Sequence, residues 1–235
     1  MATSGVTTWT LNRDQVIKGA LRKLGVLPSG GSPTANQTSD ANEALNSLLK
    51  AYEADGMPLW KVLSTTFTTV SGTNTYNIGP GQTIATTGMP LKLLQAFYTV
   101  SGGTNTPINV YTRYDFNQLP QATTITGTPV NIYYQPLRTS GVIKVWPTPN
   151  NSTTTITVHY QSPYEDMVNS TDDFDFPSYW MQALIYGLAW TLASEYGLPL
   201  QDRKMIGDEA QYWHQLALSF GSEEGSLFFQ PRLDE

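Results

Sequence analysis

The sequence predicts an α+β protein. We expect a four-helix bundle formed by the N- and C-terminal segments, with an antiparallel β-sandwich or barrel inserted between its second and third helices. Of the 31 threonines, 23 lie between residues 58 and 164, with most of the Pro and Asn residues that mark turns. Apolar residues at helical spacing flank this stretch on both sides. The predicted domains are a discontinuous helical domain (1–57 and 166–222), a β domain (58–165) and an extended tail (223–235).

The N-terminal part predicts two helices. Within residues 12–24, apolar side chains recur at three- and four-residue steps, and Gly25 stands where a C-cap is expected. A Gly/Ser/Pro/Thr loop follows over 30–37. Ser39 is then expected to cap a second helix that stops at Gly56 and Pro58. Two helices joined by a polar loop form an αα-hairpin.

The middle part predicts six to eight short strands between turns. Residues 154–160 show the pattern most clearly, because Ile156, Val158 and Tyr160 alternate with polar residues, as in a half-buried strand. Gly- and Asn-containing turns separate the other runs. The expected strands are 60–70, 76–78, 91–100, 130–134, 142–146 and 154–160.

The C-terminal part predicts two more helices. Pro177 is suited to the first position of a helix over 178–196, which is apolar around nearly its whole circumference and should be buried on all sides. It is expected to stop at Gly197-Leu198-Pro199. A fourth helix is expected over 201–219. Its inward residues are predicted to be Met205, Ala210, Trp213, Leu216, Ala217 and Phe220.

Composition excludes several classes of protein. The 235 residues include no cysteine, so the chain forms no disulfide, thiolate nucleophile or cysteine-ligated metal site. The longest apolar stretch, residues 180–193, is shorter than the ~20 residues that span a bilayer. The N-terminus has no signal-peptide pattern, so we expect synthesis in the cytoplasm.

Charge is distributed unevenly along the chain. The net charge is −6, and residues 165–235 hold thirteen acids against three bases. Arg13, Lys18, Arg22 and Lys23 concentrate positive charge on the first helix. We interpret them as the solvated face of an amphipathic helix, because the acidic C-terminal third opposes tight binding of a polyanion.

Motifs for catalysis or cofactor binding are absent from the sequence. It contains no Gly-rich nucleotide loop, no HExxH and no GxSxG. His159 and His214 lack a neighbouring base-and-nucleophile pattern, so we expect each at the surface or in a boundary layer. The sequence therefore predicts no enzyme activity, no cofactor and no metal site.

Two groups of residues leave other functions open. An acidic cluster could ligate a hard cation or form a glycosidase pair, with Glu165 and Asp166 as the first candidates. We favour a solvated loop whose carboxylates stabilise the next helix. Aromatic residues of the β domain could stack on sugars, although a sandwich core or a protein interface uses them more often. The acidic cluster is Glu165, Asp166, Asp172, Asp173 and Asp175, and the aromatic group is Tyr111, Tyr114, Tyr133, Tyr134, Trp146 and Tyr160.

The order of these elements resembles the head-to-tail adaptor proteins of short-tailed bacteriophages, the tail-tubular or head-completion group. Packing and turn residues carry the resemblance, above all the stretch that begins Phe176-Pro177-Ser178-Tyr179-Trp180 and ends at Gly197. The other stretches are 16–24, 45–60, 127–134 and 145–149.

The resemblance implies a structural virion protein, made in the host cytoplasm, at the head-to-tail interface. It implies a ring of twelve subunits beneath the portal protein that extends the DNA channel and attaches the downstream tail (nozzle) protein. Double-stranded DNA would pass through without sequence-specific binding, and no membrane is involved. The alternative is a carbohydrate- or receptor-binding module of a phage tail, and a cell-wall hydrolase is a lesser one.

The resemblance also implies contact residues. Leu227, Phe228 and Phe229 in the tail would contact the portal. A ring needs two different complementary patches on each subunit. We expect one patch to include Trp190 and Trp213, and the other to lie on the opposite flank of the helical domain.

Overall fold

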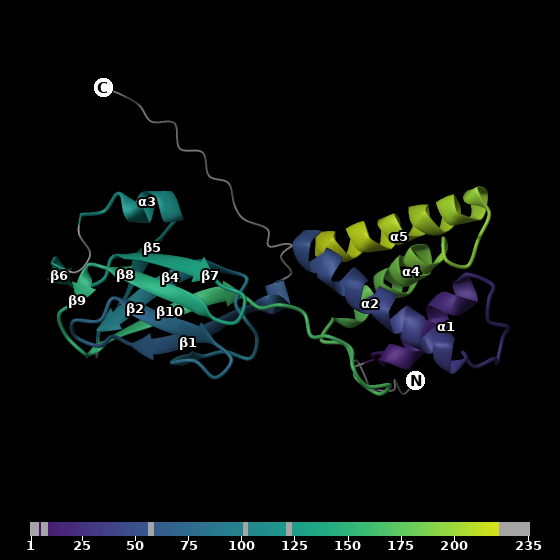
Figure 1. Ribbon diagram of the computed structural model, residues 1–235, viewed down its shortest axis with the longest axis horizontal. Coiled ribbons are helices and arrows are strands. Elements are labelled where there is room, and N and C mark those ends of the chain that lie inside the picture. Colours follow the sequence, from purple (N-terminus) through teal and green to yellow (C-terminus); the bar gives the residue numbers. More distant parts are fainter. Residues whose placement is uncertain (1–4, 6–8, 56–58, 101–102, 121–123, 221–235) are drawn as a thin grey trace, which may run out of the picture. The chain divides into compact units, whose positions relative to one another are not determined.

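The computed structural model describes residue 5 and residues 9–55, 59–100, 103–120 and 124–220 (Figure 1). Contacts divide the chain into two compact units, Met1–Leu59 with Tyr164–Glu235, and Trp60–Pro163. The first unit holds the long helices and the second holds the strands. The predicted α+β class is confirmed.

The first unit begins with two capped helices, α1 (Arg13–Lys23) and α2 (Ala35–Asp55). Asn12 accepts a hydrogen bond from the Gln15 amide, and the Gln15 side chain accepts one from the Asn12 amide, which closes a capping box. α1 ends as expected, before Gly25 at a φ of +71°.

The second helix starts earlier than Ser39. Thr34 and Gln37 exchange the same pair of hydrogen bonds as Asn12 and Gln15, so a capping box begins α2 at Ala35. The predicted start was wrong because the polar residues 35–37 were assigned to the loop, and the Thr34-x-x-Gln37 pattern was missed.

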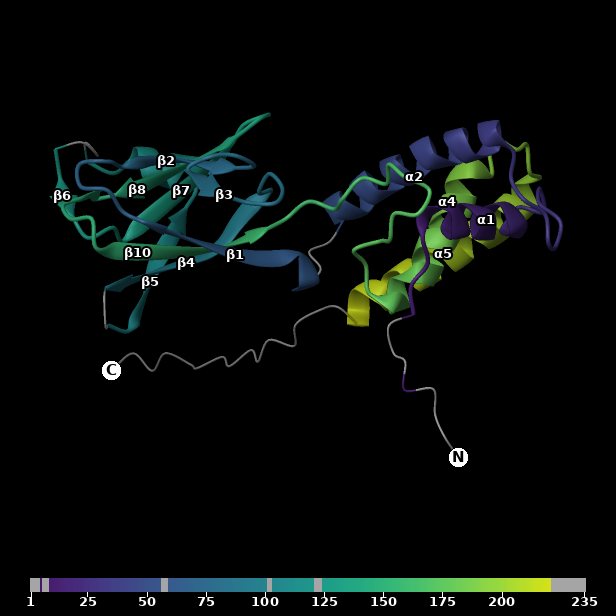
Figure 2. The same cartoon turned by 90° about the horizontal axis from the view of Figure 1, so that it is seen from below.

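Helix α4 (Met181–Leu192) follows a 3-10 turn, η2 (Ser178–Trp180), and contacts α1, α2 and α5 (Figure 2). Its buried residues include Ala183, Leu184 and Leu188, which fits the predicted central position. Trp190 departs from burial on all sides within one subunit, since 56 % of it is exposed. The helix also ends at Leu192 rather than at residue 196, and a turn closes at Gly197.

Helix α5 (Leu200–Phe220) buries only two of the six residues that were predicted to face inward. Its buried residues are Ala210 and Ala217, which allow α5 to lie close against α4. Met205, Leu216 and Phe220 are exposed, so that part of the prediction was wrong. Large apolar residues on this helix mark its outer surface.

The second unit is built on an eight-stranded sheet with strand order β1-β10-β4-β5-β7-β8-β2-β3. A short 3-10 turn, η1 (Leu59–Lys61), precedes it, and β5 is followed by a short helix, α3 (Arg113–Asn117). A separate pair joins β6 to β9. The strands are β1 (Val62–Thr68), β2 (Thr75–Gly79), β3 (Ile84–Ala85), β4 (Lys92–Val100), β5 (Asn105–Tyr111), β6 (Thr126–Gly127), β7 (Asn131–Pro136), β8 (Gly141–Trp146), β9 (Thr148–Pro149) and β10 (Thr154–Gln161).

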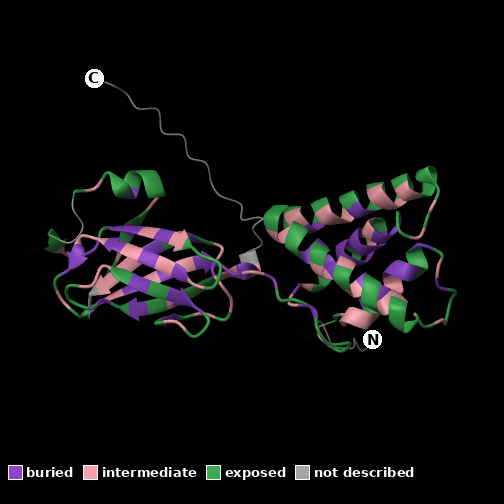
Figure 3. Cartoon of the chain, viewed as in Figure 1, coloured by how far each residue is buried: buried purple, intermediate pink, exposed green. Residues whose placement is uncertain are grey.

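This sheet folds back on itself into a nearly closed structure. Figure 2 shows β2, β7 and β8 in one layer and β1, β4 and β10 in the other. The first and last strands in the order, β1 and β3, also contact one another. One apolar core fills the space inside (Figure 3). Its most deeply buried members are Ile78, Ile132, Ile143, Val145, Ile156 and Val158.

The sheet is mixed, whereas a purely antiparallel one was predicted. β5 pairs antiparallel with β4 but parallel with β7, and β2 pairs parallel with β3. Parallel strands need a crossover connection, and α3 lies in the one that joins β5 to β7. Strand β5 was not predicted, because Pro107 and alternating Asn and Thr residues weaken its strand pattern.

Candidate functional site

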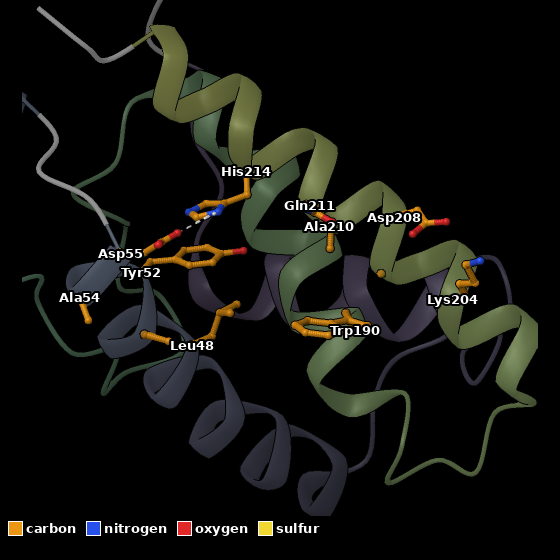
Figure 4. Close-up of a pocket in the computed structure, with 12 residues that line it drawn as sticks. Leu48, Tyr52, Ala54, Asp55, Trp190, Lys204, Asp208, Ala210, Gln211 and His214 are labelled. Atoms are coloured by element: carbon orange, nitrogen blue, oxygen red, sulfur yellow. Dashed lines mark ion pairs between the residues drawn. The ribbon is translucent and has the colours of Figure 1, made fainter.

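The helical unit carries a groove of about 690 Å³ between α2, α4 and α5 (Figure 4). Leu48 and Tyr52 come from α2, Trp190 from α4, and His214 from α5. Its floor is apolar and aromatic, and its charged residues are Asp55, Lys204 and Asp208. The full lining is Leu48, Ala51, Tyr52, Ala54, Asp55, Trp190, Lys204, Gly207, Asp208, Ala210, Gln211 and His214.

Two helical glycines shape this groove. A Cβ on Gly207 would lie 2.9 Å from the Trp190 Nε1, so a side chain there would displace the indole. A Cβ on Gly187 would overlap the Tyr52 hydroxyl, which donates to the Ala183 carbonyl oxygen at 3.2 Å. The sequence analysis missed both residues. Glycine inside a helix costs about 1 kcal/mol relative to alanine, and that penalty is the signal that could have identified them.

An aromatic stack closes one end of the groove. The rings of Tyr52 and His214 lie 4.1 Å apart and nearly parallel, and Trp180 meets His214 edge-on at 5.5 Å. Trp180 is buried, and Phe176 packs against it at 5.5 Å. These contacts fix the His214 ring between α2 and the start of α4, in the boundary layer predicted for it.

Burial controls the protonation of this stack. Desolvation lowers the pKa of His214, and the Asp55 carboxylate, with Oδ2 3.6 Å from Nδ1, only partly opposes that shift. Asp55 is mostly exposed, so solvent screens its charge, whereas the His214 Nε2 is buried and has no hydrogen-bond partner among the described residues. His214 is therefore neutral at neutral pH. Desolvation by burial, with a smaller contribution from Asp55, raises the pKa of the Tyr52 hydroxyl.

The acidic cluster stabilises a loop. Asp166 Oδ1 lies 2.9 Å from Lys50 Nζ on α2. Asp172 accepts hydrogen bonds from the Asn169 amide at 2.6 Å, from the Asn169 side chain at 3.0 Å and from the Val168 amide at 2.9 Å, and these bonds lower its pKa. Asp173 makes an isolated bridge to Asn12. Among the described residues, no group of three or more His, Cys, Asp or Glu is arranged to hold a metal ion.

The matching family model is that of the SU10 adaptor protein, and it covers residues 14–223. The chain belongs to the SU10 adaptor family. The predicted resemblance to phage adaptors is confirmed, and the adaptor is a structural component of the virion. No curated protein matches this sequence. None of the described helices of the adaptor combines the length and the apolar character that a membrane span needs.

The predicted contact residues of the adaptor fall on separate surfaces. Trp190 lines the groove, but Trp213 does not; its Nε1 donates to Glu209 Oε2 at 3.1 Å and its ring meets Tyr212 edge-on at 5.2 Å. Leu227, Phe228 and Phe229 lie outside the described residues.

The basic residues of α1 in the adaptor are partly used in internal contacts. Arg13 donates to the Val168 carbonyl oxygen at 2.8 Å, and Lys23 donates to the Tyr186 hydroxyl at 2.9 Å. Arg22 is exposed and Lys18 is half-buried. These contacts tie α1 to the acidic loop and to α4.

The aromatic group of the β unit is divided between core and surface. Tyr134 and Tyr160 are buried in the core, and Trp146 donates to the Pro120 carbonyl oxygen at 3.1 Å. Tyr133 packs against Phe116, with ring centroids 5.5 Å apart. Tyr114 is 73 % exposed. His159 lies on β10, 5.8 Å from the Phe97 ring.

Proposed function

We propose that this adaptor forms a homo-oligomeric ring of twelve subunits beneath the portal, extends the DNA channel and attaches the downstream tail protein. Membership of the adaptor family is the observation that carries the proposal. Exposed apolar residues on α4 and α5 support it, because exposed apolar surface marks protein interfaces. They are Trp190, in the groove, and Met205, Tyr212, Leu216 and Phe220 of α5, which do not line the groove.

In the proposed ring, the helical unit acts as a four-helix bundle of α1, α2, α4 and α5 whose α4–α5 flank meets the opposite flank of the next subunit. Heterologous contacts of this kind close a ring when the rotation between subunits is right. The discontinuous helical domain and the inserted β domain would then have separate tasks, assembly and tail attachment.

The acidic balance supports passage of DNA. Residues 165–235 hold thirteen acids against three bases, and few basic residues are available to neutralise phosphate. A channel wall with this charge lets DNA slide without sequence-specific binding.

The ring is tested by mixing the adaptor with purified portal and measuring mass by mass photometry. We expect a complex with twelve adaptor copies, and Trp190→Ala should weaken it while leaving the adaptor folded. Trp9→Ala is the matched control, since Trp9 is also 56 % exposed but lies before α1. A monomer both alone and with portal would refute the ring, whereas a ring that forms only on the portal agrees with stepwise assembly.

Portal contact by Leu227, Phe228 and Phe229 is tested separately. Replacing all three by serine should reduce portal binding at least tenfold, because apolar anchors in desolvated pockets dominate such interfaces. Unchanged binding would remove the tail from the portal interface without affecting the ring.

A further inference from the structure

The groove between α2, α4 and α5 lacks a natural cover among the described residues. Trp190 lies in it more than half exposed, beside Gly207, and the stack of Tyr52 and His214 closes one end. Exposed indole and tyrosine surface is unfavourable in water and favourable to bury. An apolar segment bound along the groove would bury this aromatic surface.

The tail after α5 leaves the helix near the end of the groove at which His214 lies. α5 ends at Phe220, whose ring packs against Tyr179 at 4.8 Å and fixes the point from which the tail departs. With a rise of 1.5 Å per residue, Gln211 and Gly207 lie about 14 and 20 Å back along the helix from Phe220. The six residues 221–226 span at most about 20 Å when extended. The next three residues can therefore reach the groove between His214 and Gly207.

Those next three residues are Leu227, Phe228 and Phe229, the longest apolar run after α5. Their side chains match the aromatic and aliphatic lining of the groove. Arg232 follows three residues later, and Asp208 stands on the rim that α5 contributes. The length of the tail, its apolar run and its basic residue thus match the distance to the groove, the apolar lining and the acidic rim.

We propose that, in the free subunit, residues 221–235 fold back and dock Leu227, Phe228 and Phe229 in the groove of the same chain. Docking covers Trp190. If the tail then moves to the portal, as the proposed function requires, Trp190 becomes available to a neighbouring subunit. That consequence rests on the proposed function, and it would make portal binding the trigger for ring closure. Docking itself needs neither portal nor ring.

The absence of cysteine allows a direct test in the full-length protein. Gln230→Cys, just after the apolar run, is combined either with Lys204→Cys, in the groove, or with Met205→Cys, on the outer face of α5. The two positions are adjacent on one helix, so an undocked tail meets both about equally. Because a disulfide forms only between nearby residues, docking should raise the intramolecular cross-link yield at 204 at least fivefold over that at 205. Equal yields would overturn the proposal.

Two further measurements keep the test decisive. Phe228→Ser with Phe229→Ser should reduce the 204 yield to that of 205, whereas Ser222→Ala with Ser226→Ala should leave it unchanged. A cross-linked dimer in place of a cross-linked monomer would show that a second copy fills the groove, and would overturn docking within one chain. If either cysteine pair fails to fold, Gln211→Cys and Tyr212→Cys provide a second adjacent pair. The assay contains no portal, so failure of the ring proposal would leave its result unchanged.

Discussion

Gly187→Ala tests how α2 packs against α4. A Cβ at position 187 would overlap the Tyr52 hydroxyl and lie 3.1 Å from Leu48 Cδ2. Overpacking of this kind costs roughly 1–3 kcal/mol, and loss of the hydrogen bond from Tyr52 to Ala183 adds about 1 kcal/mol. The higher helix propensity of alanine relative to glycine offsets about 1 kcal/mol of this loss. We expect a net loss of about 1–3 kcal/mol in unfolding free energy.

Urea unfolding of the helical unit, followed by far-UV circular dichroism, measures this loss. Tyr52→Phe removes the overlapping hydroxyl, so Gly187→Ala should cost less than about 1 kcal/mol in that background, a coupling that a double-mutant cycle reports. Gly19→Ala is the matched control, because its Cβ would meet the Ile185 side chain at 3.3 Å or more. Equal costs of Gly187→Ala with and without the tyrosine hydroxyl would refute the reasoning.

Three further changes test other parts of the structure. Asn12→Ala removes the capping box of α1 and should lower helical-unit stability by about 1 kcal/mol in urea; Asn12→Asp, which can still accept, should retain it. Ile143→Ala, at a fully buried position of β8, should cost about 2–5 kcal/mol in the unfolding of the β unit, followed by near-UV circular dichroism, and should leave the helical transition unchanged. The lowered pKa of His214 means that the folded state prefers the neutral ring, so stability should be full above about pH 6.5 and decline as pH falls below it. His214→Phe keeps the stack on Tyr52 but should flatten that decline in thermal melts, and an unchanged slope would contradict the assignment to His214.

Local patterns predicted the helices well where capping and periodicity agree. α1 follows from its apolar spacing, the Asn12 region and Gly25. The central position of α4 follows from its nearly complete apolar circumference. In both cases short-range signals are sufficient to predict the helix, because the residues that end it or bury it lie within it or next to it.

The inward face of α5 could not be predicted in the same way. Hydrophobicity assigned Met205, Leu216 and Phe220 to the core together with Ala210 and Ala217, but of these five the structure buries only the two alanines. Close approach to α4 selects small residues, and the large ones are left outside. A sequence pattern reports that a face avoids water, but it does not report whether the same chain or another one covers it.

The groove and the sheet order are also beyond local patterns. More than 100 residues of sequence separate Tyr52 from Trp190 and His214. Only the packing of α2, α4 and α5 brings the three side chains together. The parallel pairing of β5 with β7 likewise depends on the path of the chain through α3. The two histidines were expected in surface or boundary positions, and His214 was found there, but its stack on Tyr52 depends on packing between α2 and α5.

The pairing of β1 with β10 has a consequence for how the protein is made. Residue 62 lies opposite residue 161, so once the β unit has folded, its own first and last strands hold together the two points where the chain enters and leaves it. An open loop of about 100 residues would otherwise cost the helical unit roughly 4 kcal/mol of closure entropy. On the ribosome, however, α1 and α2 emerge long before α4, and at about 5–20 residues per second they wait roughly 7–27 s for it. During that interval the apolar faces of α1 and α2 are not covered by α4, and a β unit in which β1 has paired with β10 shortens the search when α4 arrives.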